Sequence, residues 1–333
     1  MKSAGLFIRE SDPADAEAVA SLMTHAFGDD DSQFVFDPAW WRWKYAANPA
    51  GYHGLVAQDG DGRVVGHYGG VPMDVRADGE WLTFGQNCDS CSDPEVRRGL
   101  GNPGLFVRLA QAYANTFAIP GGDAVMYGLP NRSVYRIANR YMDYWTLRQQ
   151  WMLVAQGEHH APEDTGVRIE RATSFGDDVT ALYERLTSSY RCMARRDARF
   201  LNWRFRDAPG APYEITLARD ATDGTLRAYA VHRRAQMMGH DVGVVVDWLC
   251  DPEDHAAGVA AQGAVRSRHS ARDNQTVAFL CPTSSVWFGE FQRWGFRVVP
   301  SPYMMIGRPF VPQLEPRYLR EHWYYTLADF DIY

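Results

Sequence analysis

The chain carries one sequence pattern twice, and this repeat constrains the fold more than any single motif does. Four segments recur in the same order, and the offset between the two copies drifts only from 160 to 152 residues, as short loop insertions and deletions would produce. The matched segments are Trp43-Lys44-Tyr45 with Trp203-Arg204-Phe205, the turn at 59–62 with the turn at 220–224, Asp89 with Asp247, and Pro130 with Pro282. Two copies of a unit of roughly 145 residues therefore make up most of the chain.

Each copy shows the hydrophobic periods of both strands and helices. Ser11-Asp12-Pro13 is typical of a helix start, and the Asp-Gly-Asp-Gly run at 59–62 predicts a hairpin. We expect strands at 7–9, 55–57, 64–70, 81–92 and 124–129, and helices after Pro13, at 103–117 and at 133–141. The predicted fold class is α+β, with two tandem domains that each have a central mixed β-sheet flanked by helices. The predicted boundaries are 1–155 for the N-terminal domain, 156–166 for a linker, 167–310 for the C-terminal domain, and 311–333 for an aromatic, acidic tail.

Composition excludes several classes of protein. Apolar residues make up 46% of the chain, which can fill hydrophobic cores and excludes a disordered or fibrous chain. The net charge of −7 disfavours a nucleic-acid partner, because such proteins normally carry a basic face. The N-terminal residues do not resemble a signal peptide, and no apolar run approaches the roughly 18 residues of a membrane helix. Five cysteines, a small and odd number, suit a reducing compartment, so we expect a cytoplasmic protein. We also expect no membrane partner, and the oligomeric state stays open.

The segment at 93–106 is the richest in chemical signals. It contains two adjacent arginines and three glycines, and it leads into a helix with Asn102 as its expected cap and Pro103 in its first turn. Glycines let backbone amides approach a ligand closely, and a helix N-terminus presents free N–H groups. Arginines add positive charge for phosphate oxygens. The segment predicts an anion-binding loop, with a simple glycine-rich turn before a capped helix as the alternative.

These segments resemble the GCN5-related N-acetyltransferase (GNAT) superfamily, and specifically its tandem two-domain members. The resemblance rests on Asp93-Pro94-Glu95 at a strand end, the arginine- and glycine-containing loop that follows, the two Trp-basic-aromatic segments, and Asn131 through Tyr135. It implies acyl-coenzyme A, most simply acetyl-coenzyme A, as co-substrate, with the pyrophosphate held by loop amides. The residues that it assigns to the coenzyme are Cys91, Ser92, Arg97, Arg98, Gly99, Leu100, Gly101, Asn102, Gly104, Leu105 and Asn131.

The second copy differs in this loop. It reads Asp-Pro-Glu-Asp-His-Ala-Ala-Gly from Asp251, with no arginine and with Asp254 where phosphates would lie. A carboxylate at that position repels a pyrophosphate. We therefore predict that coenzyme A binds the first copy only, and that the second copy has a structural and substrate-lining role.

Two residues are candidates for proton transfer. The tyrosine that GNAT proteins often use as general acid is replaced here by Asn139. Tyr135 is our candidate acid for the leaving thiolate, with a core aromatic role as the alternative, because Trp287 is its match in the second copy. Asp89 is our candidate base, and Asp247 at the matching position leaves a structural role open.

We expect no metal site. Cys88 and Cys91 form a single CxxC pair without a second pair or a nearby histidine. In a strand these two positions point to opposite faces. Buried structural cysteines are the favoured interpretation, with a nucleophilic Cys91 as a minor alternative.

The last eleven residues contain five aromatic side chains, which is too apolar for a segment left in water. We expect this tail to pack on the body, along a groove between the two copies. Strand-like alternation would put Asp329 and Asp331 on one face and Phe330 and Ile332 on the other. Those carboxylates are predicted to bind a cationic amine or to take its proton, with a docked tail and solvated carboxylates as the alternative.

These features together predict an acyl-coenzyme A-dependent N-acyltransferase that acylates a primary amine of a small molecule by direct attack on the thioester. Backbone amides near Cys91 would polarise the thioester carbonyl. Two alternatives stay open: a non-catalytic acyl-coenzyme A sensor or scaffold, and a tRNA-dependent aminoacyltransferase, which the acidic charge disfavours. The sequence specifies neither the amine nor the length of the acyl chain.

Overall fold

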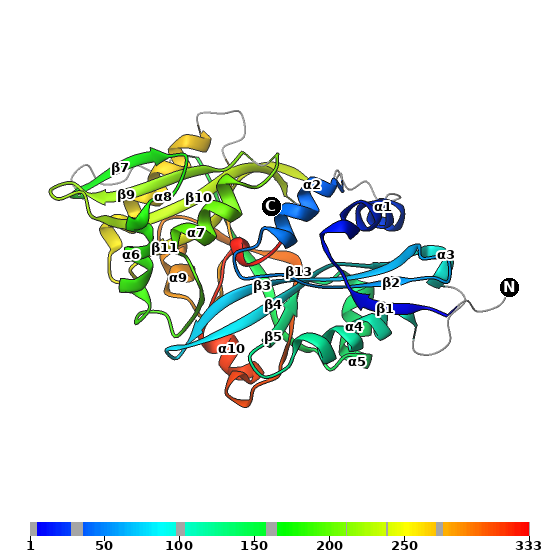
Figure 1. Cartoon of the computed structure of the whole chain (residues 1–333). Coiled ribbons are helices and arrows are strands. Elements are labelled where there is room, and N and C mark those ends of the chain that lie inside the picture. The colour runs from blue at the N-terminus through cyan, green and yellow to red at the C-terminus, as the bar shows by residue number, and fades with distance from the viewer. Residues whose placement is uncertain are drawn as a thin grey trace. The chain divides into compact units, whose positions relative to one another are not determined.

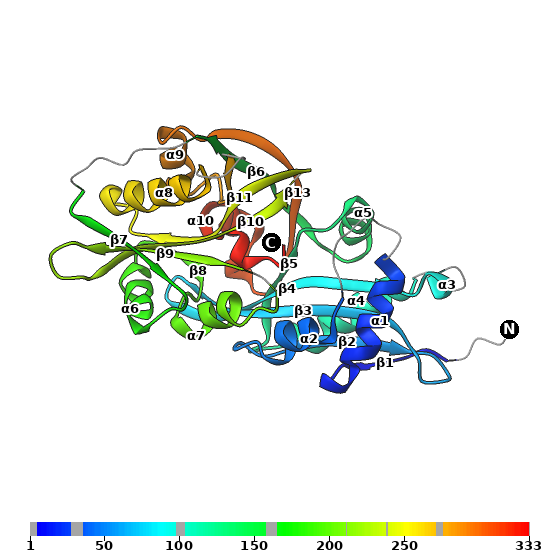
Figure 2. The same ribbon diagram turned by 90° about the horizontal axis from the view of Figure 1, so that it is seen from above.

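The computed structural model describes residues 5–27, 36–97, 104–157, 165–210, 212–237, 239–270 and 276–332, with Arg97 described by its backbone alone. The chain divides into two compact units that interleave along the sequence. Unit 1 comprises Met1–Asp74, Leu82–Leu147 and Met304–Pro316, and unit 2 comprises Val75–Trp81, Arg148–Tyr303 and Arg317–Tyr333. Figures 1 and 2 label the elements of both units.

Unit 1 is built on a mixed β-sheet. Its strands are β1 (Phe7–Glu10), β2 (His53–Gln58), β3 (Val64–Ala77), β4 (Glu80–Ser92), β5 (Asp123–Gly128) and the second half of β13 (Arg297–Pro309). They are adjacent in this order. β4 and β5 are parallel, whereas the registered pairs β1–β2, β2–β3 and β5–β13 are antiparallel. The helices of unit 1 are α1 (Ala16–Phe27), α2 (Pro38–Trp41), α3 (Pro94–Arg97), α4 (Leu105–Phe117) and α5 (Arg132–Tyr141).

Local sequence signals explain where most of these helices begin. Asp12 forms a capping box at the turn that leads into α1, and Asn131 caps α5 through hydrogen bonds from two backbone N–H groups. The expected cap at Asn102 is wrong, because α4 begins at Leu105 and its N-cap is Gly104. Gly104 has the extended backbone that an N-cap needs and contributes no side-chain hydrogen bond.

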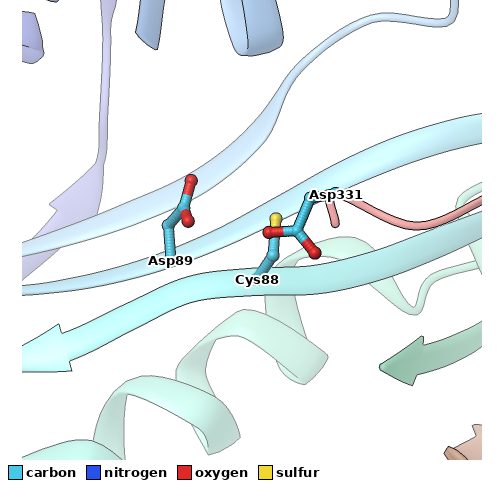
Figure 3. A group of neighbouring side chains, drawn as sticks. All are labelled: Cys88, Asp89 and Asp331. Carbon is cyan, nitrogen blue, oxygen red and sulfur yellow. The ribbon is translucent and has the colours of Figure 1, made fainter. Parts of the chain in front are cut away.

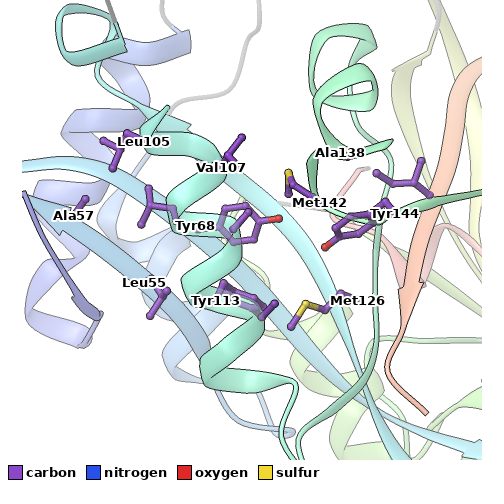
Figure 4. Packing of buried hydrophobic residues seen from close by; sticks show 14 of the residues in the cluster. Leu55, Ala57, Tyr68, Leu105, Val107, Tyr113, Met126, Ala138, Met142 and Tyr144 are labelled. Carbon is purple, nitrogen blue, oxygen red and sulfur yellow. The ribbon is translucent and has the colours of Figure 1, made fainter. Parts of the chain in front are cut away.

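The core of unit 1 lies between α4 and the sheet (Figure 4). Its buried residues come from β2, β3, β5, β13, α4, α5 and the short segment after α5, and they include Leu55, Tyr68, Leu105, Tyr113, Met126 and Tyr144. The apolar face of α4 therefore packs with residues of β2, β3 and β5.

Unit 2 has a second mixed sheet. Its strands follow the order β6-β12-β11-β10-β9-β7, where β11 and β12 are parallel and the other registered neighbours are antiparallel. These strands are β6 (Trp145–Gln156), β7 (Val167–Ala172), β9 (Glu214–Asp220), β10 (Leu226–Met237), β11 (His240–Cys250) and β12 (Thr276–Phe279). The short strands β8 (Cys192–Ala194) and β14 (Trp323–Tyr324) pair with each other, and β8 also pairs with the end of β3. The helices are α6 (Asp177–Leu186), α7 (Ala198–Leu201), α8 (His255–Ser270), α9 (Val286–Arg293) and α10 (Pro316–His322).

The two units repeat one order of elements. In each, a first strand and helix precede a short helix that continues into a π-helical turn, Arg42–Ala46 in unit 1 and Asn202–Arg206 in unit 2. An antiparallel run of strands, a parallel strand pair and a helix then follow. The predicted α+β class is confirmed, whereas the predicted sequential boundaries at 155 and 167 stay a prediction. Among the described helices, none has the length and apolar character needed to cross a membrane.

Candidate functional site

The candidate site lies where the parallel strands of unit 1 separate. Registered pairs between β4 and β5 run from Thr83–Asp123 to Gln86–Tyr127, and β4 then continues to Ser92 whereas β5 ends at Gly128. Gly128 still lies against β4, because a Cβ there would come within 2.9 Å of the carbonyl oxygen of Asn87. Beyond this point, one edge of β4 has no registered partner from β5 in the described structure. Such an edge can bind an extended ligand through backbone hydrogen bonds.

Asp89 lies on this part of β4, next to Cys88 (Figure 3). Several neighbours hold its side chain and its backbone. Its Oδ2 atom accepts hydrogen bonds from Lys44 Nζ at 2.7 Å and from the Tyr45 hydroxyl at 2.9 Å. His67 Nδ1 lies 2.8 Å from the Asp89 carbonyl oxygen. The side chains of Lys44 and Asp89 are only 5% and 15% exposed, so the ion pair is largely removed from water. The local backbone is unusual, since Asp89 has a positive φ of 49° within a strand.

Burial sets the protonation of the groups around Asp89. Burial lowers the pKa of His67, so its ring is neutral at physiological pH and its Nδ1–H can donate to the Asp89 carbonyl. Burial and then the Asp89 charge raise the pKa of Tyr45, which keeps that hydroxyl protonated as a donor. The network therefore consists of one carboxylate, one ammonium group and two neutral donors.

Tyr135 and Asn131 lie in the first turn of α5 and at its cap. The Tyr135 hydroxyl is 2.7 Å from Thr146 Oγ1, and the Asn131 side chain accepts from Ser133 N at 3.1 Å and Val134 N at 3.0 Å. Asn131 is exposed and Tyr135 is partly exposed. In the described hydrogen bonds, Tyr135 and Asp89 share no partner, so the structure does not join the two candidate proton-transfer groups directly.

The predicted coenzyme loop is described only at its ends. Arg98, Gly99, Leu100, Gly101 and Asn102 lie outside the described residues, and Arg97 ends α3. At the other end, Gly104 caps α4 and Leu105 is buried. The predicted backbone contacts Cys91 and Ser92 end β4 with buried side chains, at 2% and 3% exposure.

Asp93 anchors the start of this loop. It is 2% exposed, its Oδ1 accepts from Glu95 N at 2.8 Å, and its Oδ2 accepts from Arg63 Nη1 at 3.0 Å. Its backbone N–H donates to the Val65 carbonyl at 2.9 Å. The Asp-Pro-Glu signal thus corresponds to a side-chain turn that ends β4 and begins α3.

Several groups of the site had no role predicted from the sequence. Lys44, Tyr45 and His67 surround Asp89, and the Tyr144 hydroxyl donates to Asn87 Oδ1 at 2.5 Å where the strands separate. The repeat pointed to one of these groups, because both copies of the Trp-basic-aromatic segment have a basic residue at the same position, Lys44 and Arg204. In unit 1 the basic residue of this segment pairs with Asp89, whereas Arg204 in unit 2 donates to the Tyr213 hydroxyl and to the Phe330 carbonyl.

The matching place in unit 2 is occupied by the chain's own side chains. Registered pairs between β11 and β12 end at Val245–Phe279, and β11 continues to Cys250. The Tyr324 hydroxyl donates to the Trp248 carbonyl at 2.6 Å, and the Tyr190 hydroxyl donates to the Cys250 carbonyl at 2.8 Å. A pocket of about 300 Å³ remains beside them, lined among others by Pro252, Ser285 and His322. Two carbonyls of β11 are therefore satisfied within the protein.

The loop of unit 2 also lacks an open anion site. Asp254 Oδ1 accepts from Ala257 N at 3.0 Å at the start of α8, and Arg227 binds both carboxylate oxygens at 2.7 and 2.8 Å. Burial opposes ionisation, but the hydrogen bonds from Arg227 and from the helix lower the pKa of Asp254 overall. A carboxylate thus fills the position at which the sequence of the first copy predicts a phosphate.

The two predicted tail carboxylates have different surroundings. Asp329 is fully buried, and Arg196 Nη2 lies 2.5 Å from its Oδ2. Residues Leu327–Asp329 form a 3₁₀ turn with a capping box at Thr326, and Phe330 is also buried. The expected strand alternation is therefore wrong, because the ion pair and the capping box draw Asp329 into the protein. Asp331 is partly exposed.

Comparisons with known proteins agree with this geometry. Residues 7–139 match the family described as "Acetyltransferase (GNAT) domain". Solved structures with a similar fold include an Enterococcus faecalis protein described as a probable N-acyltransferase (TM-score 0.69, 14% identity, covering 95% of this chain and 75% of that one) and a GCN5-related N-acetyltransferase from Anabaena variabilis (0.68, 11%, 92% and 73%). A third is the Saccharomyces cerevisiae N-myristoyltransferase with bound myristoyl-CoA (0.57, 11%, 92% and 82%). No curated protein sequence matches the chain.

A mixed sheet with a separating parallel pair, followed by a loop and a helix, defines a GNAT-type domain. Residues 7–139, within unit 1, match a GNAT acetyltransferase domain, and the solved structures share the fold of the chain. The predicted resemblance is thus confirmed. The match of residues 7–139 to this domain family supports acyl-coenzyme A-dependent N-acyltransferase activity.

Proposed function

We propose that this protein transfers an acyl group from acyl-coenzyme A to a primary amine of a small molecule, and that unit 1 performs the reaction. The observation that carries this proposal is the separation of β4 from β5 after Gln86–Tyr127, within the segment that matches the GNAT family. The edge of β4 beyond its last registered pair with β5 suits the extended pantetheine arm, and the loop between α3 and α4 suits the pyrophosphate. The negative charge of the chain favours a cationic amine over a tRNA as acceptor.

The proposed reaction is a direct acyl transfer. The amine nitrogen forms a bond to the thioester carbonyl carbon, the C–S bond breaks, and the thiolate leaves with its electron pair. The nitrogen loses one proton and the thiolate gains one, so the products are an amide and free coenzyme A. Backbone N–H groups near Cys91 and Ser92 would stabilise the oxyanion, and Tyr135 is the proposed acid for the thiolate.

The tail supplies a proposed acceptor contact. Asp331 is partly exposed and follows directly on Phe330 and Asp329, which are buried in unit 2. Its carboxylate would attract an ammonium group. The anchoring role of Asp329 changes the design of the test: Asp331→Asn probes the acceptor site, whereas deletion of 329–333 also removes the buried ion pair.

Incubation with acetyl-coenzyme A and a panel of primary amines is expected to release thiol in proportion to amide formed. A thiol reagent follows the release, and mass spectrometry identifies the amide. If the protein binds acetyl-coenzyme A tightly and no amine in the panel causes turnover, it is a sensor or scaffold and the enzyme proposal is wrong. Longer acyl-coenzyme A donors in parallel reactions report the acyl-chain preference.

Isothermal titration is expected to show one coenzyme A site per chain. Arg98→Ala with Gly101→Val is expected to weaken binding about 10- to 100-fold, because charge-assisted contacts to phosphate are lost and the loop backbone is obstructed. The matched control is Asp254→Asn in unit 2, which is expected to leave the affinity unchanged. Two sites per chain, or undiminished binding by the double variant, would contradict the assignment to unit 1.

A further inference from the structure

Asp89 has a backbone conformation that sets it apart from the rest of β4. Among the described residues, three that are not glycine have a positive φ: Asp78, Asp89 and Asp143. Asp78 lies in the turn between β3 and β4, and Asp143 follows the end of α5, so both occur at chain reversals. Asp89 alone lies inside a strand. The left-handed region is unfavourable for most residues, and such strain often marks a functional site.

The neighbours of Asp89 hold this conformation from the side chain and from the backbone. Lys44 and Tyr45, on one π-helical turn, bind its Oδ2, and His67 on β3 binds its carbonyl. Oδ2 therefore already accepts two hydrogen bonds, one of them from an ammonium group at 2.7 Å. An ion pair and a hydrogen bond at one oxygen suit a side chain that holds its backbone in place.

The second copy serves as an internal comparison. Asp247 matches Asp89 and also has a basic partner, Arg196, and a hydroxyl partner, Tyr229 at 2.7 Å. Asp247 is fully buried and is not among the residues with positive φ. Its unit has Asp254 in place of the phosphate-binding arginines. The charged network thus occurs in both copies, whereas the left-handed residue occurs only in the copy that has the arginine- and glycine-containing loop.

We propose that Asp89 is a positioning residue: Lys44, Tyr45 and His67 hold it in the left-handed conformation, and this conformation orients the backbone of Ser90–Ser92 toward the thioester. This inference rests on the proposed acyl transfer in unit 1. It replaces the role of general base predicted for Asp89 with a backbone role. Lys44, Tyr45 and His67 then act through Asp89 and not on the substrate.

Three substitutions at one position separate the two roles. Asn and Gly adopt positive φ readily, whereas Ala does not, and none of the three can act as a carboxylate base. If Asp89 is a positioning residue, Asp89→Asn and Asp89→Gly keep kcat within a few-fold, and Asp89→Ala lowers kcat about 10-fold or more. If Asp89 is the base, all three lower kcat by about 10²- to 10⁴-fold.

The readouts are kcat, KM for acetyl-coenzyme A, and coenzyme A affinity by titration. Rescue by Asn and Gly relative to Ala supports the inference, whereas equal losses in all three variants, or no loss in any of them, overturn it. Asp143→Ala and Asp143→Gly are the matched controls, because Asp143 has a φ of 56° and an exposed side chain, and we expect both to keep full activity. Each Asp89 variant is also made together with Lys44→Met. Comparison of the single and double variants separates the effect of an unpaired Lys44 from the effect of the changed backbone conformation.

Failure of the proposed function is distinguishable from failure of this inference. If the wild-type protein acylates no amine, the proposed function fails. The affinity of the three variants for coenzyme A then tests the positioning role of Asp89, because this measurement does not need turnover. Reduced affinity in Asp89→Ala alone supports the positioning role, and equal affinity in all three overturns it. Circular dichroism of each variant shows that it is folded before either readout is interpreted.

Discussion

Arg196→Met is expected to lower the free energy of unfolding by about 3–5 kcal/mol at pH 7. The Arg196 side chain is fully buried, with Nε 3.1 Å from Asp247 Oδ2 and Nη2 2.5 Å from Asp329 Oδ2. Both carboxylates are also fully buried. Methionine keeps much of the side-chain volume but leaves two buried carboxylates without their guanidinium partner. Urea unfolding followed by circular dichroism measures the loss.

The loss is expected to depend on pH. Burial raises the pKa of Asp329, and loss of the Arg196 charge removes the main effect that opposes this rise, so the protonated form of Asp329 favours the folded state. The penalty is then small below the unfolded pKa of about 4 and grows as the pH rises through the folded pKa of Asp329. A loss that stays constant from pH 4 to pH 7 would show that packing, and not charge, is the main contribution of Arg196.

Arg206→Met is the matched control. It removes the same side chain from an ion pair with Asp207 in which both partners are about half exposed. Water screens such pairs, so we expect nearly unchanged stability. Equal stability of the Arg196 and Arg206 variants would refute the role assigned to the buried network.

The stability of the protein is expected to fall as the pH drops below 6.5, with a contribution from His232. Its ring is buried between Thr216 Oγ1 at 2.9 Å and His269 Nε2 at 3.1 Å. Burial, and then the neighbouring His269, lower the pKa of His232 from 6.5 to about 3. The unfolded chain therefore binds a proton that the folded protein excludes, so the stability present above pH 6.5 is lost as the pH falls toward 3. This residue alone contributes a slope of about 1.4 kcal/mol per pH unit.

His232→Gln tests this dependence. The variant removes the titrating ring, so its free energy of unfolding is expected to fall less steeply between pH 6 and pH 4 than that of the wild type. His240→Gln, at an exposed position on β11, is the control for loss of a histidine and is expected to keep the wild-type slope. Identical slopes in all three proteins would mean that His232 does not exclude the proton in the folded state.

Local sequence patterns predicted the elements of the fold well. Asp12 caps the turn that leads into α1, where a helix start was expected, and Asn131 caps α5, close to the helix expected at 133–141. The Asp-Gly turn at 59–62 joins β2 to β3, as expected. These signals act between residues a few positions apart, so a single sequence contains them completely. The internal repeat added the order of elements in unit 2, because the same local signals recur there.

Long-range pairing decided what local patterns could not. The tip of the β3–β4 hairpin belongs to unit 2, since Val75–Ala77 pairs with β8, and the second half of β13 belongs to unit 1, since it pairs with β5. Strand period tells which face a residue occupies and not which strand lies beside it. Sequential domain boundaries were therefore the natural prediction, and interleaved units were not visible in the sequence.

The sequence by itself determined the α+β class, the repeat, the family resemblance and the segment at 93–106 as the chemical signal of the first copy. Only the tertiary structure decided that Asp329 is buried against Arg196, 133 positions away, that Tyr190 and Tyr324 satisfy the carbonyls of β11, and that Asp89 is held by Lys44 in a left-handed conformation. The physical reason is that periodicity and capping are properties of neighbouring residues. A charge partner or a strained backbone angle exists only after distant segments have packed together.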